Sequence, residues 1–326
     1  MKGRIKKAAG LFLAMTVAVC AMGIPAGAEE EKKNEDEILI GYSPMTLVNE
    51  YFSAVEDAIQ EVCDENGATL ITYDPQMDAT KQATQIEDMI SMGIQALVYI
   101  PVDSAGGRTI MQECKDAGIY VVNIDNLVIE DDSDVVDCKI ASDNYGLGYL
   151  SGQDVAERFP DGANIVIAHS PTSESCNVTV GAFWDAIKEN AEDPDKFEEL
   201  MEFDGQGDTA VSFEYMVDAL EAYDDIDVVY CVNDASALGV IQAIEESGKG
   251  EDIAVYGKDG SPNGKLAISE GKMVQSSGQS PLTLGKLGAE AALDLIHGEE
   301  VEFEVSVDAF SITADNLEEY GIDTWQ

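Results

Sequence analysis

Residues 253–285 read IAVYGKDGSPNGKLAISEGKMVQSSGQSPLTLG, and this stretch decides the fold. An apolar run ends in Lys258-Asp259-Gly260, a helical pattern follows, and a second short apolar run ends in Gln279-Ser280-Pro281 before another helix begins. Two strand ends thus bring polar side chains to one edge of a sheet. Ligands of open α/β sheets lie at that edge, at the carboxyl ends of the strands. We therefore expect a small solute to bind between two such edges.

The alternation of strands and helices extends outward from this stretch. Strand candidates lie at 38–42, 69–73, 96–100 and 120–124, and, after a break at 135–142, at 165–168, 199–203, 228–232 and 254–256. Helical patterns lie at 50–66, 79–92, 105–117, 180–192, 210–222, 235–247 and 262–270. The strands are too continuously apolar for one face to be wet, which is typical of parallel sheets covered by helices on both faces. The predicted fold class is α/β, with two similar Rossmann-like lobes.

The last part of the chain is predicted to tie the lobes together. A helix is expected at 281–297, over the first lobe, and one or two strands at 301–312. The chain would then cross between lobes near Ser142, near Gln279 and around 307–310, which forms a three-segment hinge. The predicted N-terminal lobe is 38–142 with 280–308, and the C-terminal lobe is 143–279 with 309–326.

The first 28 residues have the pattern of a signal peptide. Four basic residues precede an apolar run from Ala8 to Ile24, and Ala26-Gly27-Ala28 offers a cleavage site. A membrane anchor fits less well, because the run is short and charges follow at once. A lipid anchor at Cys20 is a third alternative, although Val19 is large for a lipobox. We expect cleavage after Ala28, export to the periplasm or cell envelope, and a charged linker over 29–37.

Composition narrows the class of partner. Of the 326 residues, 45% are hydrophobic and the formal charge is −46, which becomes −50 without the four basic residues of the leader, since all 64 acids follow it. Such a field repels nucleic acid and anionic membranes. After cleavage five cysteines remain, with no C-x-x-C, and only His169 and His297 are present. We therefore expect no metal site and no cofactor.

Short motifs in a fixed order resemble the type I periplasmic sugar-binding proteins, close to ribose-binding protein, over about residues 38–320. The motifs are Asn49-Glu50-Tyr51-Phe52, Pro101-Val102-Asp103-Ser104, Ile124-Asp125, Ala141-Ser142-Asp143-Asn144, Asn233-Asp234, Gly257-Lys258-Asp259-Gly260 and Gly278-Gln279. The resemblance implies a monomeric receptor that binds a sugar or polyol in the interlobe cleft. It also implies delivery of the solute to the membrane permease and ATPase of an ABC importer.

The resemblance implies a set of ligand-binding residues. They are Asn49, Tyr51, Phe52, Asp125, Asn126, Thr179, Phe203, Asn233, Lys258, Asp259 and Gln279. Carboxylates and amides suit sugar hydroxyls, and an aromatic plane suits the apolar face of the ring. Other roles remain open: Tyr51 and Phe52 as core anchors, and the Asn and Asp residues in turns. Asp143 is expected to cap a helix beside the site, and Trp184 to lie in the core.

The sequence departs from the ribose-type pattern where that pattern has arginine or an aromatic ring. Asn126, Asn177 and Thr179 replace arginines, so rigid bidentate donors are missing. Lys258 replaces an aromatic ring, and we expect it to pair with a neighbouring aspartate rather than with an anionic group of the ligand.

Other functional classes leave weaker traces in the sequence. Asp204-Gly-Gln-Gly-Asp208 lacks the further oxygen ligands of a calcium loop, and a turn that ends in an Asp208 helix cap is preferred. Paired carboxylates could serve glycoside hydrolysis, but no histidine-based triad or phosphate loop is present. A sensor that presents ligand to a signalling protein stays an alternative to transport, whereas a repressor would carry a DNA-binding motif in place of the leader.

Overall fold

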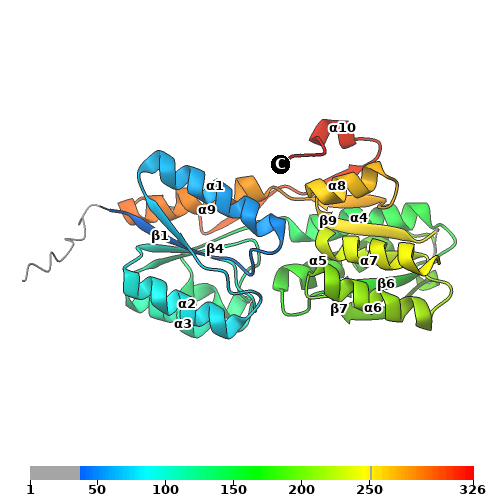
Figure 1. The fold of residues 1–326 in the computed structure, drawn as a ribbon, viewed down its shortest axis with the longest axis horizontal. Helices are drawn as coiled ribbons and strands as arrows, with labels where there is room; N and C mark the ends of the chain where they lie inside the picture. Colours follow the sequence, from blue (N-terminus) through cyan, green and yellow to red (C-terminus); the bar gives the residue numbers. More distant parts are fainter. Residues whose placement is uncertain (1–36, 250–251) are drawn as a thin grey trace, which may run out of the picture. The chain divides into compact units, whose positions relative to one another are not determined.

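A computed structural model describes residues 37–249 and 252–326. The predicted signal peptide, the alternative lipid anchor at Cys20 and nearly all of the charged linker lie outside these residues. Within them the chain forms two six-stranded sheets, each flanked by helices (Figure 1). The predicted α/β fold with two lobes is confirmed.

All strand pairs in the first sheet are parallel. In spatial order the strands are β11 (Glu304–Val307), β5 (Cys138–Ser142), β4 (Tyr120–Ile124), β3 (Ala96–Tyr99), β1 (Leu39–Ser43) and β2 (Thr69–Thr72). The helices that belong with this sheet are α1 (Glu50–Asn66), α2 (Ala79–Met92), α3 (Arg108–Asp116), the 3-10 helix Glu130–Val135 and α9 (Pro281–His297). We call this unit the first lobe.

The second sheet has the same plan with one antiparallel edge, where β12 pairs with β10. Its strands in spatial order are β12 (Phe310–Thr313), β10 (Gln275–Gly278), β9 (Ala254–Asp259), β8 (Val228–Cys231), β6 (Ala163–His169) and β7 (Phe197–Asp204). Its helices are α4 (Asn144–Arg158), α5 (Glu174–Asn190), the 3-10 helix Pro194–Lys196, α6 (Thr209–Ala222), α7 (Asp234–Ser247), α8 (Pro262–Ser269) and α10 (Leu317–Tyr320). We call this unit the second lobe.

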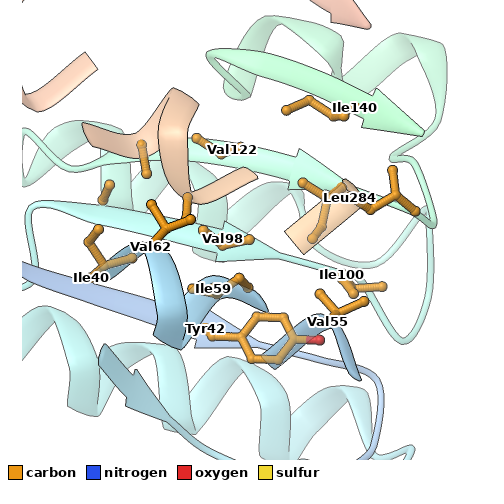
Figure 2. Packing of buried hydrophobic residues seen from close by; sticks show 14 of the residues in the cluster. Ile40, Tyr42, Val55, Ile59, Val62, Val98, Ile100, Val122, Ile140 and Leu284 are labelled. Atoms are coloured by element: carbon orange, nitrogen blue, oxygen red, sulfur yellow. The ribbon is translucent and has the colours of Figure 1, made fainter. Parts of the chain in front are cut away.

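Both faces of each sheet are buried because successive residues of a strand point to opposite sides. In β3, Val98 faces the cluster formed with α1 and α9, whereas Leu97 faces the cluster formed with α2 and α3. Figure 2 shows Val98, Ile59 and Leu284 meeting in the first of these clusters. The expected position of α9 over the first lobe is therefore confirmed.

Helix ends follow the signals in the sequence. Asn49 caps the start of α1 by accepting from the Tyr51 backbone N–H, and Gly67 ends the helix in the left-handed conformation. The cap roles expected for Asp143 and Asp208 are also confirmed, at the starts of α4 and α6.

Helix α4 is an element that its glycine-interrupted sequence does not suggest. A side chain at Gly148 would lie 1.9 Å from the Thr179 carbonyl oxygen, and one at Gly152 would lie 2.1 Å from that of Phe183. These glycines let the backbones of α4 and α5 approach closely. Helix α5 also begins at Glu174 instead of the expected residue 180, because Ser173 caps it.

The chain passes from one sheet to the other three times, after β5, after β10 and between β11 and β12. The last passage is short, since only Asp308 and Ala309 separate β11 from β12. These passages occur where the sequence predicts the three-segment hinge.

The packing of α9 gives a stability test. Leu284 is fully buried against the first sheet, whereas Leu282 on the same helix is 40% exposed. We expect Leu284→Ala to lower the free energy of unfolding by about 2–5 kcal/mol, because it leaves a cavity in the core. Leu282→Ala is the matched control and should change it by less than about 0.5 kcal/mol. Equal urea midpoints for the two variants would contradict this description of the core.

Candidate functional site

A cavity of about 400 Å³ lies at the carboxyl ends of the strands of both sheets. Its lining comes from the segments that follow β1, β2, β4, β6, β7, β8 and β10 and from the last two residues of β9. This volume is in the range of small-molecule sites. The position agrees with the edge that the sequence indicates.

Most of the predicted site residues line this cavity. They are Asn49, Tyr51, Phe52, Asp125, Asn126, Asn233, Lys258, Asp259 and Gln279. Lining residues that the sequence did not single out include Ser173, Ser175 and Cys176 at the start of α5. The cluster of Ser and Thr in Ser170-Pro-Thr-Ser-Glu-Ser175 is the signal that could have indicated them, since such residues favour turns and helix caps.

Two predicted residues lie elsewhere. Thr179 is fully buried inside the second lobe, where its hydroxyl donates to the Ser175 carbonyl oxygen at 2.6 Å. Phe203 is 4% exposed and its ring stacks on Tyr215, with 5.3 Å between centroids. Neither residue lines the cavity, which corrects their assignment to the site.

The two strand-end aspartates are held by neutral donors. The Tyr51 hydroxyl donates to Asp125 Oδ1 at 2.8 Å, and Gln279 Nε2 donates to Asp259 Oδ1 at 2.7 Å. Burial raises the pKa of Asp125, and the charge of Lys258 and the Tyr51 hydroxyl partly offset that rise. Burial also raises the pKa of Asp259 well above its usual range, with Lys258 again opposing the rise. The two carboxyl groups are therefore fixed in position and poorly solvated.

Backbone strain is concentrated at this cavity. Five non-glycine residues of the described chain have a positive φ, and all of them line it: Gln76, Met77, Asp125, Gln206 and Asp259. Asp125 has φ 60°, in the left-handed helical region, whereas Asp259 has φ 123°, outside it. Such conformations cost on the order of 1–3 kcal/mol each and persist where the surroundings impose them. The strained residues indicate a preorganised site.

Tyr51 and Phe52 combine the two roles that the sequence left open. Both line the cavity, and both belong to the buried core of the first lobe. Their rings meet edge to face, with 5.3 Å between centroids. Because the Tyr51 hydroxyl is bound to Asp125, this ring also orients a carboxylate.

Asn126 lines the cavity, but its amide is already bound by protein groups. Oδ1 accepts from the hydroxyls of Ser173 at 2.9 Å and Ser104 at 3.2 Å, and Nδ2 donates to the Pro101 carbonyl oxygen at 2.8 Å. Ser173 belongs to the second lobe and the other partners to the first. Asn126 therefore joins the lobes, and its role in binding the ligand stays a prediction.

Further hydrogen bonds join the lobes beside Asn126. The Ser175 hydroxyl donates to the Asp125 carbonyl oxygen at 2.9 Å, and the Glu174 N–H donates to the Ser104 hydroxyl at 3.0 Å. The Ser104 N–H donates to the Thr172 carbonyl oxygen at 3.2 Å. We call this set, together with Asn126, the α5 latch.

The other two asparagines act mainly as helix caps. Asn233 caps α7 through Oδ1, and its Nδ2 donates to the Gly207 carbonyl oxygen at 3.0 Å. Asn49 caps α1 through Oδ1. The turn chemistry expected as an alternative for these residues is present, although both side chains still line the cavity.

A second connection between the lobes involves residues that the sequence did not highlight. The buried ammonium of Lys265, in α8, donates to the Thr324 carbonyl oxygen and to Gln326 Oε1. The neighbouring Trp325 lies edge to face against Tyr51, with 5.9 Å between ring centroids. The segment after α10 thus contacts both α8 and an aromatic residue of the cavity.

Lys258 does not form the ion pair with an aspartate that the sequence suggests. It is 5% exposed and lines the cavity, but no carboxylate of the described chain lies within 4.0 Å of its ammonium. Burial alone would lower the pKa of Lys258, yet Cys176, Asp259 and Asp125 raise it overall. The expected ion pair with a neighbouring aspartate is therefore wrong, and Lys258 interacts with these carboxyl groups only at longer range.

The described residues contain no metal-binding cluster and no membrane-spanning helix. In 37–249 and 252–326, no three or more His, Cys, Asp or Glu side chains are placed to hold a metal ion. Over the same ranges, no helix has the length and apolar character that crossing a bilayer requires.

Comparisons with known proteins agree with this geometry. The ribose import binding protein RbsB of Bacillus subtilis (strain 168) is 29% identical over 306 residues, which cover 93% of this chain and 97% of that protein. A solute-binding protein of Bacillus halodurans C-125, solved with bound myo-inositol, superposes with a TM-score of 0.79 at 27% identity, over 87% of this chain and 96% of that one. A solute-binding protein of Mycobacterium smegmatis, solved with bound glycerol, superposes with a TM-score of 0.82 at 26% identity, over 89% of this chain and 99% of that one.

The family model for the periplasmic binding protein domain matches residues 40–300, which span most of both lobes. This match, the two mainly parallel sheets and the cavity at the carboxyl ends of their strands lead to one conclusion: the chain belongs to the periplasmic binding protein family.

Proposed function

We propose that this protein is an exported receptor that captures a sugar or sugar-like polyol in the cavity and delivers it to an ABC importer. The observation that carries the proposal is a cavity lined from both sheets by carboxyl groups, an amide and aromatic rings. The relatives support it, since they are described as a ribose import protein and as solute-binding proteins with bound myo-inositol or glycerol.

The polar groups of the cavity suit hydroxyl groups. Asp125 and Asp259 offer acceptor oxygens beyond those bound to Tyr51 and Gln279. Gln279 Oε1 is buried and has no hydrogen-bond partner in the described chain. A buried acceptor without a partner costs about 1–3 kcal/mol, which a ligand hydroxyl would recover. The ring faces of Tyr51 and Phe52 supply apolar contact from the first lobe.

The capture mechanism is closure of the lobes around the solute. Asp125 belongs to the first lobe and Asp259 to the second, so a solute that touches both binds the closed form better than the open form. The α5 latch forms across the same gap, and its hydrogen bonds between the lobes add stability to the closed form. Hinge closure around a ligand is the known behaviour of periplasmic binding proteins.

The remaining parts of the proposal concern the chain's surroundings. We infer that residues 1–28 are removed during export, that 29–37 form a linker, and that the protein acts as a monomer. The proposed lobes are 38–142 with 280–308, and 143–279 with 309–326. The closed form would dock on a permease that works with an ATPase. Delivery to a signalling protein is the alternative partner, and neighbouring genes for a permease or for a sensor kinase would distinguish them.

Catalysis is the rival class, because the same two aspartates could serve glycoside hydrolysis. Incubation with radiolabelled sugars and glycosides distinguishes a receptor from a glycoside hydrolase. A receptor should return the intact solute, whereas turnover would refute the proposal.

The proposed function is tested by a thermal-shift screen over pentoses, hexoses, polyols, amino sugars and sugar acids. A solute present at 100 times its Kd stabilises the folded state by about 2.7 kcal/mol and so raises the melting temperature. Failure of every class to raise it would contradict the proposal.

Asp259 gives a test of both binding and strain. Asp259→Ala should weaken binding of the best solute of the screen more than tenfold, since a hydroxyl loses its buried partner. Asp259→Gly should weaken it as much but melt at a higher temperature than Asp259→Ala, because glycine adopts positive φ freely. Asp218→Ala, exposed on α6 of the same lobe, is the control. Calorimetry showing unchanged affinity would remove Asp259 from the site.

The α5 latch gives a second binding test. Ser175→Ala removes the hydroxyl that donates to Asp125 across the lobes and keeps the backbone of α5. We expect affinity to fall by about three- to tenfold, mainly through faster dissociation, since one hydrogen bond is worth about 0.5–1.5 kcal/mol. Ser269→Ala, which removes a hydroxyl bonded within α8, is the matched control. Stopped-flow traces with the same dissociation rate for both variants would show that the latch does not stabilise the closed form.

A further inference from the structure

The side chain of Lys258 has no counter-ion in contact. It is 5% exposed, yet the described chain provides no hydrogen bond to its ammonium and no carboxylate within 4.0 Å. An ammonium has three N–H donors and no acceptor, and because Lys258 lines the cavity these donors are available to a bound solute. A residue that only filled space here would be an apolar one.

The nearby carboxyl groups each have another hydrogen-bond partner. Asp125 is bound by Tyr51 and Asp259 by Gln279, and the unusual backbone angles of both aspartates fix where their side chains start. Asp208, the third acidic residue of the lining, accepts from two backbone N–H groups as the cap of α6. Each acid thus has its own donor, and none of the three carboxyl groups lies within 4.0 Å of the Lys258 ammonium.

The electrostatics of the lining favour a cation that stays charged. Lys258 is the one Lys or Arg among the lining residues of the described chain. Burial raises the pKa of Asp259, and the charge of Lys258 opposes that rise. Despite burial, which opposes it, the pKa of Lys258 is raised overall by Cys176, Asp259 and Asp125. A fixed positive charge therefore stands in the cavity.

We propose that the solute is a sugar acid whose carboxylate pairs with Lys258 while its hydroxyls bind Asp125, Asp259 and Gln279 Oε1. This inference rests on the proposed function and names the solute class of the same site. A carboxylate would supply both a counter-charge and acceptor oxygens, and charge-assisted hydrogen bonds are about twice as strong as neutral ones. A neutral sugar would offer Lys258 acceptor oxygens but no counter-charge. An amino sugar would bring a second cation close to Lys258.

The first experiment compares matched solutes by calorimetry on the wild-type protein. The pairs are D-glucose with D-glucuronate, D-galactose with D-galacturonate, and D-ribose with D-ribonate, and D-glucosamine is the cationic member. In at least one pair, we expect the acid to bind ten times or more tightly than its neutral partner, and we expect this preference to shrink as salt is added. Equal or tighter binding of the neutral member in every pair that binds would overturn the inference.

The second experiment measures the ratio of acid affinity to neutral affinity in variants. Lys258→Met keeps the length of the side chain and removes the charge, so this ratio should fall at least tenfold, whereas Lys258→Arg should keep a preference for the acid. Lys272→Met, at an exposed lysine paired with Glu245 and Glu270, is the control. A ratio unchanged in Lys258→Met would contradict the inference. Binding of neutral sugars alone would refute it and leave the proposed function standing, whereas binding of no carbohydrate of any charge would refute both.

Discussion

Parallel strand pairing is the constraint on which the rest of this molecule depends. It buries both faces of each sheet under helices, so the strand interiors can carry no functional groups. It also places the carboxyl ends of the parallel strands at the same edge of each sheet, whereas β12 runs the other way. The residues that line the cavity therefore come from segments far apart in the chain, such as those around Tyr51, Asp125 and Lys258. The polar groups of the site are therefore brought together by the position of these strand ends.

The same edge explains why the site is strained and buried. Asp125 and Asp259 leave their strands with positive φ, and each carboxyl group is held by one neutral donor. Burial then raises the pKa of both groups, which makes them sensitive to whatever replaces water. Strain that persists in an otherwise regular fold is a mark of function. Here it fixes two hydrogen-bonding groups that belong to different lobes before any solute arrives.

Most of the fold could be predicted from the sequence, because apolar runs, helical periodicity and capping residues agree with one another. The bounds of α1, α2 and α9 match their sequence patterns. Helix α4 could not be predicted in this way, since Gly148 and Gly152 look like helix breakers until the close approach of α5 is known.

The candidate site was predictable in part, and the misses have physical reasons. Residues directly after strands, such as Asp125 and Gln279, line the cavity as expected. Thr179 faces its own helix and Phe203 stacks in the core, whereas Asn126 lines the cavity but also accepts from serine hydroxyls. Residue identity and order indicate an edge, but they do not determine which hydrogen bonds are already satisfied. The solitary charge of Lys258 is visible only in three dimensions.

The central claim is that one solute is held intact between the two lobes at this edge. A crystal structure of the protein with the solute that most raises its melting temperature tests that claim most directly. We expect an unmodified solute in the cavity, with its oxygens within hydrogen-bonding distance of both Asp125 and Asp259. A solute bound elsewhere, bound to one lobe alone or found cleaved would contradict the account.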